Sequence, residues 1–374
     1  MNIGILTYHY SQNYGAVLQC YALKHCLEVL GHTCAVINYE DENQFNNASM
    51  YKHRHGMKRL IANAAFLPFH RVRRRKNRRF QAFRERNLTL TPRVMDQEQL
   101  ERIIRVQRFD AIIVGSDQVW NPNIRDFTPM YFLPFHIACK KIGYAISLGA
   151  ASNAQLDEYA PWIRDFDRIS VREANRIDVI RKYIEKDVDV VPDPVFLLRK
   201  TEWEYLATKA QCNLPKNRYL LCYFIDKHRI RDAMKVVNQI AKLKNLEVIS
   251  INASFSAESL KKRTKLDAGP LEFLQFILNA SFVCTDSFHG TAFSLLLDKD
   301  FLSFDAHRSS MDSRKRELLK TVGMIDRLVQ LEGGEIRVEK YEQKQVELKE
   351  HVRQMRETGM EYIKKYVCKG TQVV

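Results

Sequence analysis

Short apolar segments of strand length alternate with helical patterns along most of this chain, and this alternation limits the fold more than any other feature. Residues 2–7 are largely apolar and are followed by a polar loop. Apolar residues then recur at intervals of three and four between Val17 and Leu30, which is the spacing of one helix face. After Gly31, residues 34–37 return to an extended pattern. A strand, a helix and a second strand in this order are typical of a parallel α/β sheet.

The alternation continues and then starts again after a polar, proline-containing stretch at residues 213–217. The other strand patterns are 109–115, 141–147, 168–171, 188–191, 219–225, 246–251 and 282–285, and further helical patterns are 230–244, 271–279 and 348–366. A chain of 374 residues is long enough for two domains, at about 150 residues each. We therefore predict an α/β fold with two Rossmann-like, doubly wound domains. The predicted parts are 1–212 with an insertion at 52–93, then 213–338, then a C-terminal helix within 339–374 that packs back.

The positive charge of the chain is concentrated in one segment. The formal net charge is +15, from 59 Lys and Arg against 44 Asp and Glu. Residues 52–93 hold fourteen of these bases and a single acid, Glu85, so the rest of the chain is nearly neutral. Hydrophobic residues make up 45% and charged residues 28%, which is ordinary for a globular protein and excludes collagen-like or wholly disordered chains.

The sequence predicts a cytoplasmic protein. Residues 1–7 lack the basic region and the small-residue cleavage site of a signal peptide. The longest apolar run, 219–225, is too short to span a membrane. The eight cysteines include no C-x-x-C pair, so we expect them to be small buried hydrophobic residues of a reducing compartment rather than disulfides or zinc ligands.

The loop at residues 285–291 has the composition of an anion-binding site. It follows a strand pattern and precedes an apolar helix, so Asp286 or Ser287 is expected to cap that helix. A helix N-terminus at the carboxyl end of a strand binds anions, phosphate above all. His289, in the first turn, adds a charge or a proton. The alternative is a capped helix whose histidine is bonded within the fold.

Two further loops contain Asp117 and Arg172. Asp117 lies two residues past a strand, where a carboxylate acts as acid or base or orients a sugar hydroxyl; a simple turn is the alternative. Arg172 directly follows another strand and suits a carboxylate or phosphate ligand, or else pairs with Glu173 at the surface. The first loop contains no G-x-G-x-x-G or P-loop motif, so dinucleotide and ATP sites lack their signatures. These residues indicate an anion-binding α/β cleft but name no substrate.

Several of these loops resemble motifs of one enzyme family, the polysaccharide pyruvyl transferases. The matching segments, in the family's order and spacing, are GILT at 4–7, NYGAVLQ at 13–19, VGSDQVWN at 114–121, SVRE at 170–173, PDP at 192–194 and TDSFHGTAF at 285–293. The resemblance runs from about residue 3 to about residue 330. It implies a GT-B-like fold, in which two Rossmann-like domains face a cleft. It also implies transfer of pyruvate from phosphoenolpyruvate (PEP) to a pair of sugar hydroxyls, as a ketal.

The resemblance implies roles for individual residues. It places Asp117, Arg172 and His289 in catalysis. Substrate binding is expected from their neighbours and from the first loop: Asn13, Tyr14, Gly15, Ser116, Gln118, Trp120, Asn121, Ser287, Gly290 and Thr291. Many members have arginine where this chain has Ser287. The missing charge must come from elsewhere, and the candidates are Arg308, Arg314 and Lys299.

The chemistry that the resemblance implies suits these residues. PEP carries a phosphate and a carboxylate, so we expect Arg172 and the turn at 287–291 to supply cationic and N–H groups at two points. Ketal formation also needs a proton for the PEP methylene and a base for the sugar hydroxyl. Asp117 and His289 are the expected pair, in an order that the sequence leaves open. We expect no metal and no cofactor, with PEP as the donor substrate.

The basic segment bears on where the protein is located. Residues 71–79 hold seven bases in nine positions, and Phe69, Val72, Phe80 and Phe83 recur near helical spacing. A basic helix with an apolar face binds anionic membrane surfaces. This suits a lipid-linked oligosaccharide as acceptor and an enzyme on the inner face of the cytoplasmic membrane. The alternatives are a helix that packs on the first domain and nucleic-acid binding, which we do not expect.

The leading hypothesis is a PEP-dependent pyruvyltransferase that acts on a sugar in the biosynthesis of a polysaccharide, capsule or other cell-surface glycan. The alternative enzyme is a GT-B glycosyltransferase that uses a nucleotide sugar. The non-enzymatic alternative is an RNA-binding protein built around residues 52–93.

Overall fold

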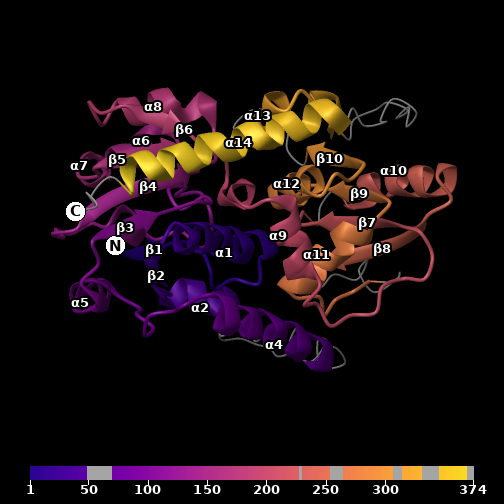
Figure 1. Cartoon of the computed structure of the whole chain (residues 1–374), viewed down its shortest axis with the longest axis horizontal. Helices are drawn as coiled ribbons and strands as arrows, with labels where there is room; N and C mark the ends of the chain where they lie inside the picture. The colour runs from indigo at the N-terminus through magenta and orange to yellow at the C-terminus, as the bar shows by residue number, and fades with distance from the viewer. Residues whose placement is uncertain (49–69, 227–229, 253–263, 306–313, 331–344, 369–374) are drawn as a thin grey trace, which may run out of the picture. The chain divides into compact units, whose positions relative to one another are not determined.

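The computed structural model describes residues 1–48, 70–226, 230–252, 264–305, 314–330 and 345–368 (Figure 1). The chain divides into two units, each described by itself. The first unit contains residues 1–71 and 81–197 and the chain from Met355 onward. The second contains residues 72–80 and 198–354. Each unit is built around a parallel sheet, which confirms the predicted α/β class.

The sheet of the first unit has six parallel strands in the order β2-β1-β3-β4-β5-β6. They are β1 (Asn2–Leu6), β2 (Thr33–Val36), β3 (Ala111–Val114), β4 (Lys140–Ile146), β5 (Arg168–Val171) and β6 (Val188–Val190). The order reverses at β1, because the chain adds β2 on one side of it and β3 on the other. Ligands of open α/β sheets bind at such a switch point, outside the carboxyl ends of the strands. The loops that follow β1 and β3 are therefore at the expected position for a site.

The helices of the first unit connect successive strands. They are α1 (Tyr14–Val29), α2 (Glu42–Ala48), α5 (Gln97–Gln107), α6 (Asn153–Asp157), α7 (Ala160–Arg164) and α8 (Ile177–Arg181). Helix α1 follows the predicted apolar stripe and ends where Gly31 was expected to stop it. The Gly31 N–H donates to the Glu28 carbonyl and the His32 N–H to the Leu27 carbonyl. These bonds form a Schellman motif, and Gly31 at φ +86° supplies its left-handed residue.

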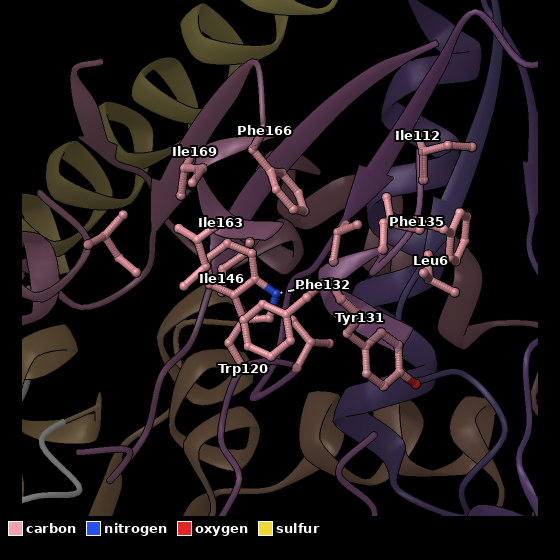
Figure 2. Close-up of a cluster of buried hydrophobic side chains, with 14 of the residues drawn as sticks. Leu6, Ile112, Trp120, Tyr131, Phe132, Phe135, Ile146, Ile163, Phe166 and Ile169 are labelled. Atoms are coloured by element: carbon pink, nitrogen blue, oxygen red, sulfur yellow. Dashed lines mark hydrogen bonds between the residues drawn. The ribbon is translucent and has the colours of Figure 1, made fainter. Parts of the chain in front are cut away.

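Part of the core of the first unit surrounds Trp120, which is fully buried (Figure 2). Its ring stacks on Phe132 with centroids 4.9 Å apart and meets Phe166 edge-on at 5.2 Å. Its Nε1–H donates to the Tyr131 carbonyl at 3.0 Å, so the polar atom of the indole is satisfied inside the core. The loop after β3 is therefore anchored in the core by its own tryptophan.

The second unit has a parallel sheet of five strands in the order β11-β10-β9-β7-β8. They are β7 (Tyr219–Phe224), β8 (Glu247–Asn252), β9 (Phe282–Thr285), β10 (Phe301–Asp305) and β11 (Leu328–Gln330). Its helices include α9 (Lys200–Ala207), α10 (Ile230–Leu243), α11 (Pro270–Asn279), α12 (Phe288–Leu296) and α13 (Arg314–Thr321). The sequence did not predict β10 and β11; β11, with three residues, is too short to show a period.

The boundary between the units differs from the predicted one at 212/213, because α9 belongs to the second unit. Trp203 of α9 is buried against Phe293 of α12, with ring centroids 4.9 Å apart. Lys200 pairs with Asp298 at 2.8 Å. The polar stretch at 213–217 is thus a loop inside the second unit, and the change of unit comes at Leu198.

The predicted C-terminal helix is α14 (Gln345–Tyr366), and from Met355 it belongs to the first unit. There the Arg356 side chain donates to the Leu197 carbonyl at 2.9 Å. The Tyr362 hydroxyl donates to the Gly143 carbonyl of β4, also at 2.9 Å. The last turns of the chain therefore pack on the first sheet. None of the helices in the described ranges combines the length and the apolarity needed to cross a membrane.

Helix α4 (His70–Asn87) is part of the predicted basic insertion, of which residues 52–69 lie outside the described residues. It does not belong to the first unit alone, because Arg79 pairs with Glu272 of the second unit at 3.3 Å. Phe80 and Phe83 are both buried, the latter beside Tyr21. The apolar face of α4 is therefore used inside the protein, as in the alternative of a helix that packs on the protein, and Phe80 and Phe83 are not available to a membrane.

Candidate functional site

Asp117 stands in a sharp turn at the carboxyl end of β3. Gly115 at φ +108° and Asp117 at φ +69° both have left-handed backbone conformations. A Cβ on Gly115 would lie 2.4 Å from the Tyr144 carbonyl oxygen, so the turn requires glycine there. The Gln118 N–H donates to Asp117 Oδ1 at 2.9 Å, and the Ser147 N–H donates to the Asp117 carbonyl at 3.0 Å. These bonds fix the carboxylate of Asp117, which remains 9% exposed.

The Arg172 guanidinium lies among three carboxylates at the same edge of the sheet. It is 2.6 Å from Asp193, 3.5 Å from Glu173 and 3.9 Å from Asp117. The Arg172–Glu173 pair is not the surface pair considered above, since the two side chains are only 4% and 2% exposed. Even with Arg176, which interacts electrostatically with Glu173, acids outnumber bases here. This surrounding favours a positioning role for Arg172 over the predicted contact with an anion.

Buried hydrogen bonds extend this cluster to four strand ends. The Ser116 hydroxyl donates to one oxygen of Asp193 at 3.3 Å, and the Val195 N–H donates to the other at 3.1 Å. The Ser147 hydroxyl donates to Glu173. Ser116 is fully buried, and its hydroxyl also lies 3.0 Å from the Ala145 carbonyl. Asp193 was not among the predicted site residues, although its position between two prolines directly after a strand could have indicated it.

Three more predicted residues follow Asp117 in the same loop. Gln118 Oε1 accepts from Asn121 Nδ2 at 2.7 Å, so the two amides hold each other. Gly149 has φ +50°, and a Cβ there would lie 2.3 Å from Gln118 Oε1. Position 149 therefore requires glycine for the Gln118–Asn121 hydrogen bond to form. Asn121 and Gln118 line the turn beside Asp117. Trp120 belongs to the core, where its ring is fully buried.

The loop after β1 is held by the cap of α1. Asn13 Oδ1 accepts from the Gly15 N–H at 3.0 Å and from the Ala16 N–H at 3.5 Å. Gly15 is buried in the first turn, and the Tyr14 side chain is fully buried. Asn13 remains partly exposed at the N-terminus of α1, where the helix dipole favours negative charge.

A second polar cluster, which the sequence analysis missed, follows β2. Glu40 is fully buried, and its carboxylate lies 3.1 Å from the Arg93 guanidinium. Burial raises the pKa of Glu40 to about 7, against the opposing effect of Arg93 and Arg84. Nearby, His9 is buried with Nε2 3.0 Å from Asn38 Oδ1, and burial lowers its pKa. Sequence patterns could not indicate this cluster, because none of its residues lies in a recognisable motif.

We expect Glu40 to make the stability of the protein fall as pH rises from about 4.5 to about 7. In that range the folded protein keeps a proton on Glu40 that the unfolded chain has lost, so raising the pH favours unfolding. Glu40→Gln should remove this pH dependence. At pH 7 and above its free energy of unfolding should exceed that of wild type by a few kcal/mol at most, since one pKa unit corresponds to about 1.4 kcal/mol. Urea unfolding at several pH values measures the difference. The exposed Glu42→Gln is the control, and parallel curves for wild type and Glu40→Gln would contradict the prediction.

In the second unit, the turn between β9 and α12 is built from hydroxyl groups. Ser287 caps α12, as predicted, by accepting from the Gly290 N–H at 3.3 Å. A Cβ on Gly290 would lie 2.3 Å from Thr285 Oγ1, so glycine permits the close approach of helix to strand. The Thr291 hydroxyl lies 2.9 Å from that of Ser303 and is fully buried. Gly290 and Thr291 therefore shape the turn.

His289 lies in the first turn of α12 and is 5% exposed. Beside this turn the Lys315 ammonium, which the sequence analysis missed, donates to the Asp286 carbonyl at 2.8 Å and to the Phe304 carbonyl. The Asp286 carboxylate accepts two backbone N–H groups after β7, at 2.7 and 2.8 Å, and burial raises its pKa. A buried ammonium one residue from the Ser287 cap adds positive charge to the helix end.

The candidates for the missing arginine charge fall in different places. Lys299 donates to the Leu278 carbonyl at 2.6 Å, which puts it just before β10, at the amino edge of the sheet. It is therefore on the wrong edge, and its predicted role is wrong. Arg314 is the half-buried first residue of α13, directly before Lys315. Arg308 lies outside the described residues.

The structure thus brings the predicted residues together in two sets. Asp117, Arg172 and their neighbours share the carboxyl edge of the first sheet, and Ser287 and His289 share that of the second. Among the described residues, no group of three or more His, Cys, Asp or Glu side chains is arranged to hold a metal ion.

Comparison with known proteins identifies the fold and the family of the chain. No curated protein matches the chain. UDP-GlcNAc 2-epimerase of Methanocaldococcus jannaschii, solved with UDP-GlcNAc and UDP, is 13% identical with a TM-score of 0.56, over 99% of this chain and 100% of that one. MnaA of S. aureus, solved with UDP, is 12% identical with a TM-score of 0.52, over 98% and 96%.

These likenesses confirm the predicted GT-B-like fold. They show the fold alone, because identities of 13% and 12% are too low to carry function. The family model for polysaccharide pyruvyl transferases matches residues 13–308, which include Asp117, Arg172 and His289. The chain belongs to the polysaccharide pyruvyl transferase family.

Proposed function

We propose that this protein transfers pyruvate from PEP to two hydroxyls of a sugar, forming a ketal during the assembly of a cell-surface polysaccharide. The observation that carries the proposal is the different chemistry of the two strand-end turns. The turn before α12 holds the Lys315 ammonium beside the helix N-terminus, and the Asp286 carboxylate there is bonded to backbone N–H groups after β7. The turn after β3 is rich in carboxylates, with Asp117, Glu173 and Asp193 around Arg172. A reaction between an anionic donor and a neutral sugar hydroxyl uses both kinds of group.

In this proposal the second unit binds the anion of PEP. The N-terminus of α12 and the Lys315 ammonium favour a phosphate or carboxylate. They supply the charge that other members of the family obtain from the arginine at the position of Ser287. The carboxylates near Asp117 would repel an anion, so we assign the sugar hydroxyl to the first unit.

Ketal formation then requires three proton movements and one leaving group. A proton goes to the methylene carbon of PEP, a sugar hydroxyl attacks the central carbon and loses its proton, and phosphate leaves. A second hydroxyl of the same sugar then bonds to the same carbon and closes the ketal, and the proton that it loses is taken up by the released phosphate. We propose Asp117 and His289 as the acid and base of these steps, because proton transfer by a positioned side chain suits both residue types. The balance of atoms requires no cofactor beyond PEP.

The acceptor and the compartment are proposed from chemistry. A sugar acceptor follows from the family, and a lipid-linked oligosaccharide is the form we propose for it. A cytoplasmic location suits a PEP-dependent enzyme. It is supported by the burial of five of the eight cysteines as small apolar side chains: Cys20, Cys26, Cys34, Cys222 and Cys284.

We expect His289→Ala to lose PEP-dependent phosphate release by about 10²- to 10⁴-fold, the usual contribution of a general acid or base. His289→Gln keeps the volume and should lose a similar factor, which separates chemistry from packing. The measurement is phosphate release from PEP in the presence of a panel of free and lipid-linked glycosides. His136→Ala, an exposed histidine of the first unit, is the control. Unchanged turnover in both His289 variants would show that the assigned role is wrong.

The fold favours one other activity, that of a nucleotide-sugar enzyme, because the structural neighbours were solved with UDP or UDP-GlcNAc. Ligand-induced stabilisation separates the two, since a ligand that binds only the folded state raises the melting temperature. We expect PEP to stabilise the wild-type protein and UDP and GDP to leave it unchanged. Stabilisation by UDP or GDP and none by PEP would replace the proposal with a GT-B glycosyltransferase.

A further inference from the structure

Four exposed arginines form a stripe along the first turns of α4: Arg71, Arg74, Arg75 and Arg78. With 3.6 residues per turn they lie within an arc of about 100°, and at about 1.5 Å per residue the stripe is about 10 Å long. The first acid of this helix is Glu85, beyond the stripe. The arginine stripe is therefore a short, dense patch of guanidinium groups on one face of the helix.

The opposite face of α4 is buried, which fixes the direction of the stripe. Lys76, Phe80 and Phe83 are all buried, and the helical period places them about 160° from the centre of the stripe. Burial lowers the pKa of Lys76 to about 7, so this lysine adds little to the surface charge. Arg79, at the side, is held by Asp267 at 3.1 Å. The helix is thus held by its inner face while the arginine stripe points outward.

Few acidic groups compensate the stripe. Within the described part of the chain, Arg75 alone among the four has an acidic partner, Asp267 at 3.1 Å. The Arg75 side chain is nevertheless 62% exposed, and such exposed pairs bind weakly. Guanidinium groups bind phosphate with two parallel hydrogen bonds. The chemistry of the stripe therefore fits a partner that presents phosphates on a surface.

We infer that the arginine stripe docks this protein on an anionic lipid bilayer, by charge and without insertion of α4. Insertion is excluded for this helix because Phe80 and Phe83 are occupied inside the protein. Single-stranded nucleic acid is the weaker fit, since it is bound by long basic grooves with aromatic side chains that stack on bases. The stripe is short, and the aromatic residues of α4 are the two buried phenylalanines. The inference does not depend on the proposed function.

The test is co-sedimentation of the full-length protein with vesicles of phosphatidylcholine alone or mixed with phosphatidylglycerol. We expect binding to the mixed vesicles only, and its loss at about 1 M salt, where the Debye length falls to about 3 Å. Arg71→Ala/Arg74→Ala/Arg78→Ala should bind about a hundredfold more weakly, since one base near an anionic membrane contributes about fivefold. The matched control removes three exposed helical arginines elsewhere, at Arg102, Arg105 and Arg164, and should bind like wild type.

Each other outcome overturns the inference. Equal binding to both kinds of vesicle, no binding to either, or equal losses in the stripe and control variants would all do so. Tighter binding to an oligonucleotide than to vesicles, lost in the stripe variant, would identify nucleic acid as the partner instead. Phosphate release from PEP with a soluble glycoside should be the same in the stripe variant and wild type. A failure of docking is therefore distinguishable from a failure of the proposed function.

Discussion

Replacement of Arg172 by alanine should lower the free energy of unfolding of the first unit by about 3 to 5 kcal/mol, the cost of removing one partner from a buried ion pair. The substitution would leave the Asp193 and Glu173 carboxylates, which are 0% and 2% exposed, without the guanidinium at 2.6 and 3.5 Å. Urea unfolding followed by circular dichroism measures the change. Arg181→Ala, which breaks a surface pair with Asp178, should cost less than about 1 kcal/mol.

A second variant separates this structural effect from a catalytic one. Asp193→Asn removes one buried negative charge and keeps the acceptor for the Val195 N–H, while the Ser116 hydroxyl can still donate to the Ala145 carbonyl at 3.0 Å. In the double variant Arg172→Ala/Asp193→Asn we expect part of the lost stability to return, because residues in contact usually couple by about 0.5 to 3 kcal/mol. If Arg172→Ala unfolds like wild type and loses only activity, the guanidinium serves the substrate and not the turn.

The strand-end loops were predictable from the sequence, and the contacts that tie them together were not. An apolar run followed by polar residues marks the end of a buried strand, and this pattern located the turns after β3 and β9 that contain Asp117 and His289. Asp193 lies 21 residues after its partner Arg172, and Lys315 lies 29 residues after Asp286. No local pattern encodes such pairs, because they depend on the register of neighbouring strands and on how a later helix packs.

Neighbours in sequence can differ in burial. Trp120, Tyr14 and Thr291 lie beside site residues in the sequence, but neighbouring residues of a turn point in different directions. The side chains of all three point into the core. The spacing of Phe80 and Phe83 correctly predicted an apolar helix face. The spacing alone could not show whether this face packs on the protein or on a membrane, because tertiary packing decides it. In this structure the face packs on the protein.

Asp117→Asn should leave the fold intact and lower kcat by about 10²- to 10⁴-fold, the range for loss of a positioned acid or base. The amide keeps an acceptor for the Gln118 N–H, now at 2.9 Å, and asparagine tolerates the left-handed backbone that this turn imposes. The variant removes only the charge and the proton-carrying capacity. Phosphate release from PEP at saturating glycoside measures kcat, and unfolding in urea checks the fold.

The KM for PEP distinguishes the role of Asp117 from that of an anion-binding residue. Because the proposal assigns the PEP anion to the turn before α12, Asp117→Asn should change the KM for PEP little while kcat falls, the behaviour of a group that acts in the transition state. Asp126→Asn is the matched control, since the structure uses the backbone carbonyl of Asp126, which accepts from Tyr8 and Gln44 at 3.1 Å. A raised KM with unchanged kcat would move Asp117 from catalysis to donor binding. That result would also assign PEP to the first unit and the sugar to the second. A carboxylate can assist the binding of an anion only through a cation, and the cation beside Asp117 is Arg172.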